Sequence, residues 1–184
     1  NDLLDKNALI IIPKSQFCEN ELHGIRSALK KRGVHIVVLS KSGQEARGMK
    51  GDKFQPDGMV VDWNKQEGVR GKYHAIILVG GKGAKKSLWD DPIIPQILTD
   101  HYRAGCVIGA MGSALVVLMA ASLITGEIPL PRDDDTQKKL ESLNAVCIDI
   151  PVTSLETIVC GQGAESVDEF SKIILDLMKA NEVF

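Results

Sequence analysis

Residues 105–115 read GCVIGAMGSAL, an apolar run that ends in small residues and is followed by an apolar helical pattern. This order is typical of a strand, a sharp turn and a helix, the arrangement that holds a nucleophile above the carboxyl ends of a parallel sheet in elbow-type enzymes. We place the tip of the turn at Ala110. A methyl group has no lone pair and cannot attack a substrate. The segment therefore predicts a catalytic scaffold without its nucleophile.

Apolar runs and helical patterns alternate along the rest of the chain. Continuous apolar runs predict buried strands over residues 8–12, 34–39, 74–79 and 106–109, and shorter strands over 145–150 and 157–160. Apolar residues at helical spacing predict helices over residues 19–32, 92–102, 113–123 and 166–179, the last with Ser166 and Glu169 as a capping box. Between these elements we expect a small hairpin or edge excursion over 43–63 and a loop over 126–135.

This alternation is typical of an α/β protein with a doubly wound, mostly parallel sheet and helices on both faces. We expect one domain over residues 1–184. Right-handed crossovers place ligand sites at the carboxyl ends of the strands. The strand ends that we expect to contribute to a ligand site are those after Ile12, Val79 and Gly109.

The composition excludes several classes of partner. A formal net charge of −2 and an aromatic content of 4% provide neither a field nor a stacking surface for nucleic acid. The longest apolar run, 114–123, is too short to span a bilayer. We expect no nucleic-acid and no membrane partner. Residues 1–7 contain two Asp and no apolar segment of the kind a leader needs, so we expect a cytoplasmic location.

The chemistry-bearing residue types give few sites. Reduced, buried thiols are expected for the cysteines in apolar runs, which are Cys106, Cys147 and Cys160. Cys18 precedes a predicted helix, where a thiol has a lowered pKa and can react. The four histidines share no placement that predicts a triad. We interpret the Asp133–Asp135 run as a solvated loop, with a divalent cation site as the less favoured alternative, and we expect no metal and no cofactor.

The run GGKGA at residues 80–84 directly follows a predicted buried strand. Successive amides of such a run can point at an anion and act as an oxyanion hole. The spacing fits neither a P-loop nor a dinucleotide fingerprint, and a tight turn without a ligand is the alternative. Glu21 lies in the first turn of the predicted helix that follows the first strand. It either holds a proton beside the elbow or is a solvated residue favoured by the helix dipole.

Three segments together resemble the ThiJ/PfpI superfamily, the flavodoxin-like group related to class I glutamine amidotransferases. They are FCENEL at residues 17–22, ILVGGKGA at 77–84 and VIGAMGS at 107–113. The superfamily contains proteases and glyoxalase-type lyases. The elbow is also similar to that of the C-terminal domain of large-subunit catalases, a domain that lacks the nucleophile too.

The resemblance implies roles for individual positions. Glu21 matches the glutamate that touches the nucleophile. Ala110 stands where the family has its nucleophilic cysteine, and Met111 stands where a histidine commonly follows that cysteine. Backbone binding is expected at three glycines, Gly80, Gly81 and Gly112. The resemblance also implies a homodimer.

Three interpretations of the function follow. We favour a non-catalytic domain that acts as a binding, stabilising or accessory module, with a small-molecule ligand in the elbow pocket. The second is an enzyme of the same fold that works without a cysteine or with Cys18. The third is a Cys→Ala form of a cysteine-dependent hydrolase or glyoxalase-type enzyme, in which Ala110→Cys would restore activity.

Overall fold

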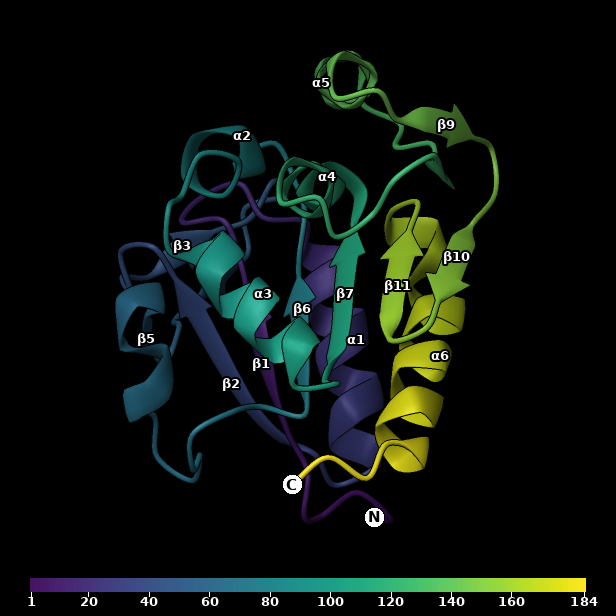
Figure 1. Ribbon diagram of the computed structural model, residues 1–184. Helices are drawn as coiled ribbons and strands as arrows, with labels where there is room; N and C mark the ends of the chain where they lie inside the picture. The colour runs from purple at the N-terminus through teal and green to yellow at the C-terminus, as the bar shows by residue number, and fades with distance from the viewer.

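The computed structural model describes residues 1–184 and is built around one seven-stranded sheet (Figure 1). The strand order is β10–β11–β7–β6–β1–β2–β5. Only the β10–β11 pair is antiparallel, which confirms the predicted α/β fold with a mostly parallel sheet. The strands are β1 (Asn7–Ile11), β2 (His35–Ser40), β5 (Gly58–Met59), β6 (Ala75–Leu78), β7 (Val107–Met111), β10 (Val152–Leu155) and β11 (Ile158–Gly161).

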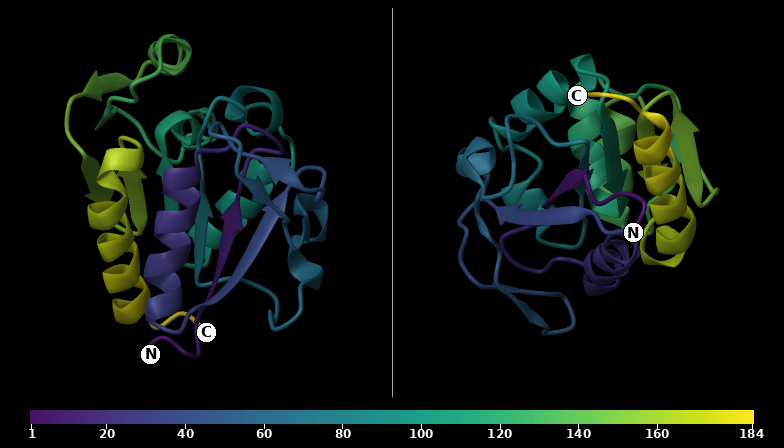
Figure 2. Two further views of the ribbon diagram at one scale, coloured as in Figure 1. Left: turned by 180° about the vertical axis from the view of Figure 1, so that it is seen from behind. Right: turned by 90° about the horizontal axis from the view of Figure 1, so that it is seen from below.

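The central strands form from continuous apolar runs because both faces of the sheet are covered. Successive residues of β1 point to opposite faces, so Leu9 belongs to one core cluster and Ile10 to the other. Four helices provide the cover (Figures 1 and 2). In the left view of Figure 2, α1 (Glu19–Lys31) and α6 (Val167–Ala180) lie side by side across one face. The opposite face is covered by α3 (Ile94–Arg103) and α4 (Leu115–Ala120).

The predicted excursion between the second and third long strands is confirmed. It contains a two-stranded hairpin of β3 (Ala46–Arg47) and β4 (Lys53–Phe54), and then β5, which pairs in parallel with β2 at the edge of the main sheet. A 3-10 helix, η1 (Val60–Lys65), completes the segment. None of the helices combines the length and the apolar composition that a membrane span requires.

The expected loop at residues 126–135 is wrong. It contains β8 (Glu127–Pro129), which pairs with β9 (Val146–Ile148) in a separate small sheet, and it leads into α5 (Asp134–Ser142). The Asp133 carboxylate caps α5 by accepting a 3.0 Å hydrogen bond from the Thr136 amide. A run of Asp is favoured there because a helix N-terminus carries a partial positive charge. Figure 1 shows α5 and β9 beyond the end of β7.

The structure differs from the sequence predictions in three smaller ways. The sequence interpretation did not include β10 or the short helix α2 (Ala84–Ser87). The capping box at Ser166 does not form. Its hydroxyl accepts a 3.2 Å hydrogen bond from the Gly163 amide and donates a 2.8 Å bond to the Gly163 carbonyl, because a 3-10 turn, η3 (Ala164–Ser166), precedes α6. Cys106 and Cys160 are buried free thiols as expected, whereas Cys147 is half-buried.

His101 is fully buried beneath the sheet and has a fixed tautomer. Its Nε2 accepts a 3.1 Å hydrogen bond from the Tyr73 amide, so its Nδ1 carries the proton that is donated to the Ile97 carbonyl at 2.7 Å. Burial lowers the pKa of His101 below its ordinary value of 6.5. Protonation at Nε2 would remove an acceptor and place a charge in the core.

We predict that this histidine makes the fold sensitive to acid. A depressed pKa contributes stability above the ordinary value of 6.5 that is lost as the pH falls through the lower, folded-state value. Urea unfolding at about pH 7.5 and about pH 5.5 should show a smaller loss of stability for His101→Gln than for the unmodified protein. The exposed His23→Gln variant is the control. Equal pH slopes for the unmodified protein and His101→Gln would contradict the prediction.

Candidate functional site

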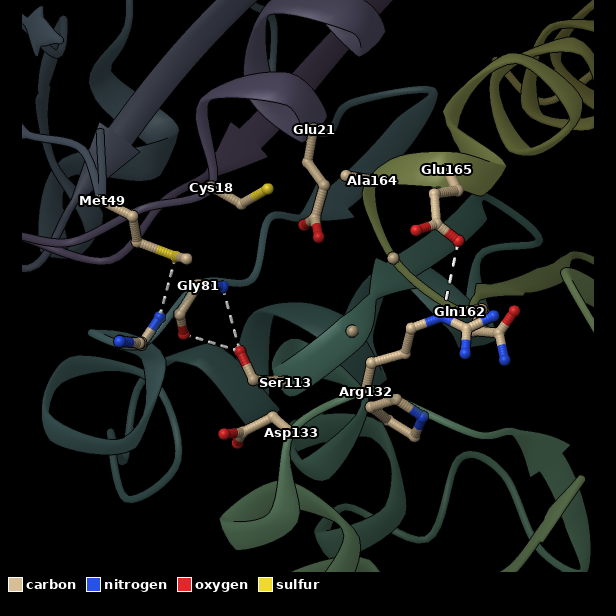
Figure 3. Close-up of a pocket in the computed structure, with 14 residues that line it drawn as sticks. Cys18, Glu21, Met49, Gly81, Ser113, Arg132, Asp133, Gln162, Ala164 and Glu165 are labelled. Atoms are coloured by element: carbon tan, nitrogen blue, oxygen red, sulfur yellow. Dashed lines mark hydrogen bonds and ion pairs between the residues drawn. The ribbon is translucent and has the colours of Figure 1, made fainter. Parts of the chain in front are cut away.

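A cavity of about 310 Å³ lies at the carboxyl ends of β6, β7 and β11 (Figure 3). The start of α1, the glycine loop after β6 and the turn after β7 form its floor and one wall. The segment before α5, the turn after β11 and Met49 between β3 and β4 form the rest. The cavity therefore lies where the topology of a doubly wound sheet predicts a ligand site.

The tip of the elbow lies at Gly112, two residues beyond the predicted position. Ala110 is inside β7, 0% exposed, and pairs with Leu78 of β6 and Cys160 of β11. Gly112 has a φ of +53°, the left-handed conformation that glycine adopts without a steric penalty. The strand continues to Met111 because Ala110 and Met111 both pair with β11 and bury their side chains on opposite faces.

Neither of the two predicted reactive positions faces the cavity. The Ala110 methyl group belongs to the core beneath α3 and α4. Met111 is 0% exposed in the opposite core, where its methyl group packs against Gly161. A cysteine at position 110 would be a core thiol, so the expectation that Ala110→Cys restores a nucleophile is wrong. The residue that faces the cavity at the tip of the elbow is Gly112, which has no side chain.

Glu21 is buried, with 4% of its surface exposed, which rules out the solvated alternative. Its Oε1 accepts a 2.8 Å hydrogen bond from the Gly80 amide. Its carboxyl group points into the cavity (Figure 3), and a side chain built on Gly112 would begin 3.3 Å from its Oε2. Burial raises the pKa of Glu21 to about 7. This carboxyl group therefore changes its charge near neutral pH.

Cys18 lies beside Glu21 at the start of α1 and lines the same cavity. Burial, and after it the negative charge of Glu21, raises the pKa of the Cys18 thiol to about 11. The predicted lowering of this pKa is therefore wrong. The helix N-terminus does favour a thiolate, but desolvation and a neighbouring carboxylate outweigh it. A thiol with so high a pKa is almost entirely protonated at neutral pH and is a poor nucleophile.

The glycine loop meets the elbow as predicted, but its amides are already used. The Gly80 amide donates to Glu21, and the Gly81 amide donates a 3.0 Å hydrogen bond to Ser113 Oγ. The Ser113 hydroxyl in turn donates a 2.8 Å bond to the Gly81 carbonyl. Gly81 has a φ of +119°, and a side chain there would collide with the Gln16 carbonyl. The Gly81 backbone lies close to the elbow, as an oxyanion hole requires. Its amide, however, is already bonded to the Ser113 side chain.

Two residues on the rim of the cavity, Arg132 and Gln162, were not selected from the sequence. Arg132 forms ion pairs with Glu165 at 3.4 Å and with Asp149 at 3.8 Å, and the Gln162 amide donates a 2.7 Å hydrogen bond to Asp149. The sequence signal that could have identified Gln162 is its position directly after the apolar run of β11. No such signal marks Arg132, because it precedes a helix outside the main sheet. No three His, Cys, Asp or Glu side chains lie close enough together to hold a metal ion.

A model of the DJ-1/PfpI family matches residues 6–177. The chain belongs to the DJ-1/PfpI family. This confirms the resemblance and places the chain in the class I glutamine amidotransferase-like superfamily. The likeness of the elbow to catalase C-terminal domains stays a prediction.

Two known proteins have sequences similar to this chain. An uncharacterized protein of Methanocaldococcus jannaschii is 29% identical over 140 residues, which cover 73% of this chain and 66% of that protein. The glutathione-independent glyoxalase DJR-1.2 of Caenorhabditis elegans is 24% identical over 177 residues, which cover 96% of this chain and 91% of that protein.

Solved structures of the DJ-1/PfpI family have the same fold. A ThiJ/PfpI domain protein from Brachyspira murdochii superimposes with a TM-score of 0.83 at 19% identity, covering 96% of this chain and 98% of that chain. Drosophila melanogaster DJ-1beta superimposes with a TM-score of 0.76 at 20% identity, covering 95% and 91%. At such identities the likeness shows the fold alone.

We predict that Glu21→Gln stabilises the protein at alkaline pH. A raised carboxyl pKa means that stability present below the ordinary value of 4.5 is lost as the pH rises through about 7. A neutral amide of the same shape avoids this loss. Relative to the unmodified protein, Glu21→Gln should gain about 3 kcal/mol of unfolding free energy between about pH 5 and about pH 8, measured by urea unfolding. The exposed Glu169→Gln variant should show no such gain, and an equally flat Glu21→Gln would contradict the prediction.

Proposed function

We propose that this chain is a ligand-binding member of the DJ-1/PfpI family that lacks covalent thiol catalysis. The observation that carries the proposal is the identity of residue 112. Gly112 adopts the left-handed conformation at the tip of the elbow, faces Glu21 and offers no atom that can attack. The family fold, the cavity and the buried carboxyl group remain, so the site keeps the means to bind a small molecule.

Two further features support a non-covalent site. The Gly81 amide is bonded to Ser113 Oγ, so it is not free to stabilise the oxyanion of a tetrahedral intermediate. The pKa of the Cys18 thiol is raised to about 11 by burial and by Glu21. These features weigh against the alternative that Cys18 replaces the missing nucleophile. They also weigh against a proposal that this chain has the glyoxalase activity for which its nematode relative DJR-1.2 is named.

The experiment restores a thiol at the tip and measures its reactivity. A side chain at Gly112 enters the cavity 3.3 Å from Glu21 Oε2. We expect Gly112→Cys to be alkylated by iodoacetamide on the order of ten times faster than Cys18 of the unmodified protein, as measured by mass spectrometry of labelled peptides. Gly112→Ala is the matched control. It shares the backbone strain of a side chain at positive φ, about 1–2 kcal/mol, but carries no thiol.

The unmodified protein is expected to convert no methylglyoxal. Rapid alkylation of Cys18 together with methylglyoxal conversion that Cys18→Ser abolishes would overturn the proposal and identify an enzyme. Failure of Gly112→Cys to be alkylated even at a pH high enough to ionise the thiol would show that the elbow is closed to small molecules, which would also contradict a binding role.

We also propose that the chain forms a homodimer, as the family resemblance implies. Light scattering coupled to size-exclusion chromatography should then give twice the mass of one chain. A single-chain mass over the accessible concentration range would contradict the proposal and would favour a stand-alone binding module.

A further inference from the structure

We propose that two copies of this chain associate through the outer edge of β10, with the two β10 strands antiparallel across a two-fold axis at Thr153. This edge would be the interface of the homodimer proposed above, on which the inference rests. The edge lies at the side of the sheet, whereas the ligand cavity lies at the carboxyl ends of the parallel strands. The interface therefore stands or falls without the ligand-binding proposal.

One edge of β10 has no partner strand. β10 is the last strand of the sheet and pairs with β11 alone. The neighbouring β8 forms its own pair with β9. In Figure 1 and in the right view of Figure 2, β10 lies at the outer margin of the molecule. The opposite edge strand, β5, has only two residues, so β10 offers the longer free edge.

Every second residue of β10 directs its backbone groups outward. In an antiparallel pair, residues that exchange hydrogen bonds with the partner strand alternate with residues that do not. The Gln162 amide donates a 2.8 Å hydrogen bond to the Pro151 carbonyl, so Pro151 faces β11. Thr153, two residues further along, faces β11 as well. The amide and carbonyl groups of Val152 and Ser154 therefore point away from the sheet, where no strand meets them.

These outward groups match a second copy of the same strand. A two-fold axis at Thr153 sets Val152 opposite the partner's Ser154, and the symmetry repeats this pair on the other side of the axis. Each pair exchanges two hydrogen bonds, so all the outward groups of Val152 and Ser154 are satisfied in both chains. An axis at Val152 would instead set Ser154 opposite the partner's Ile150. The axis at Thr153 is favoured over it, because in each chain the Ile150 amide already donates a 2.9 Å hydrogen bond to the Ile148 carbonyl.

The side chains at this edge favour burial against a second copy. Residues 150–155, IPVTSL, carry no charge, although edge strands are commonly protected from association by charged side chains. Leu155 has 78% of its surface exposed, the largest fraction among the exposed large hydrophobic residues. The proposed register sets Leu155 opposite the partner's Pro151, which is exposed as well. Each dimer would thus cover two such apolar pairs.

The acidic residues before and after the strand do not oppose each other in this register. Glu156 would lie nearest to the partner's Ile150, and Asp149 nearest to the partner's Thr157. Like charges directly opposite each other would weaken a strand pair. The proposed register avoids that repulsion.

A cysteine at the axis tests this arrangement directly. Opposite residues of an antiparallel pair that do not exchange hydrogen bonds have their Cα atoms about 4.5 Å apart, a separation that a disulfide can span. We expect oxidised glutathione to link most Thr153→Cys chains into covalent dimers, with two thiols oxidised to one disulfide and one oxidised glutathione reduced to two thiols. A non-reducing gel measures the dimers. The unmodified protein, with its half-buried Cys18 and Cys147, gives the background.

Leu155→Cys is the matched control. Position 155 is highly exposed, so chance collisions between chains would cross-link a thiol there readily. In the proposed register, however, the two copies of residue 155 lie about 13 Å apart along the strands, at about 3.3 Å per residue, which no disulfide spans. Cross-linking at position 155 equal to that at position 153, or no cross-linking at position 153, would overturn the inference.

Removal of one outward amide tests the hydrogen bonds. Ser154→Pro lacks the amide that would donate to the partner's Val152 and leaves the bonds to β11 in place, since proline is tolerated at the edge of a sheet. Light scattering should show association weakened on the order of tenfold, because the symmetric pair loses two hydrogen bonds. Ser154→Ala keeps the amide and should associate as the unmodified protein does. Unchanged association of Ser154→Pro would contradict the inference, and the cross-linking result stands by itself if this variant does not fold.

The interface and the homodimer fail separately. A two-chain mass of the unmodified protein without a cross-link in Thr153→Cys would keep the homodimer and overturn this interface. A four-residue strand pair is short beside stable interfaces, which bury about 1,200 Å² or more in total. We therefore expect the mass to fall towards that of one chain on dilution.

A different occupant of the edge would also be visible. The test is a titration with a synthetic peptide of residues 150–155, followed through the amide NMR signals of Val152 and Ser154. A single-chain mass at every concentration, together with saturable shifts of these signals, would identify the edge as a peptide-binding strand. That result would overturn the second copy as the occupant of the edge.

Discussion

The hydrogen bond from the Gly80 amide to the buried Glu21 carboxyl group joins the two elements on which the site depends. It connects the first turn of α1 to the glycine loop that follows β6. Burial of a carboxyl group is unfavourable, and a backbone donor offsets part of that cost. The group is thereby fixed beneath the elbow, and the same burial raises its pKa to about 7. The geometry and the electrostatics of the site thus have one physical origin.

The glycine at the tip of the elbow decides what this geometry can do. The turn after β7 needs a left-handed residue, and in this chain glycine fills that position and supplies no reactive group. Ser113 then closes the arrangement with two hydrogen bonds to Gly81. Where an elbow enzyme presents a nucleophile, this chain presents a position without a side chain that faces Glu21. The family fold is present, and glycine stands at the tip of its elbow.

The segment between α4 and β10 shapes the ligand space without taking part in the main sheet. The β8–β9 pair and α5 carry Arg132 and Asp133 to the rim, and the Asp133 side chain is held by the cap it forms on α5. Arg132 then connects this segment to Glu165 at the start of the last helix region. A rim assembled from segments far apart in the chain can differ among relatives that share the fold at about 20% identity.

The sequence alone determined the central strands and the four helices that cover them, because a long apolar run such as Ala75–Leu78 can be buried only with cover on both faces. It also located Glu21, Gly80 and Gly81, since their positions follow from strand ends. It misplaced the tip of the elbow. Ala110 and Gly112 are both small residues after an apolar run, and only pairing with β6 and β11 fixes where the strand ends. The pKa of Cys18 was equally out of reach, because burial and the approach of Glu21 are properties of the folded chain that outweigh the local effect of a helix N-terminus.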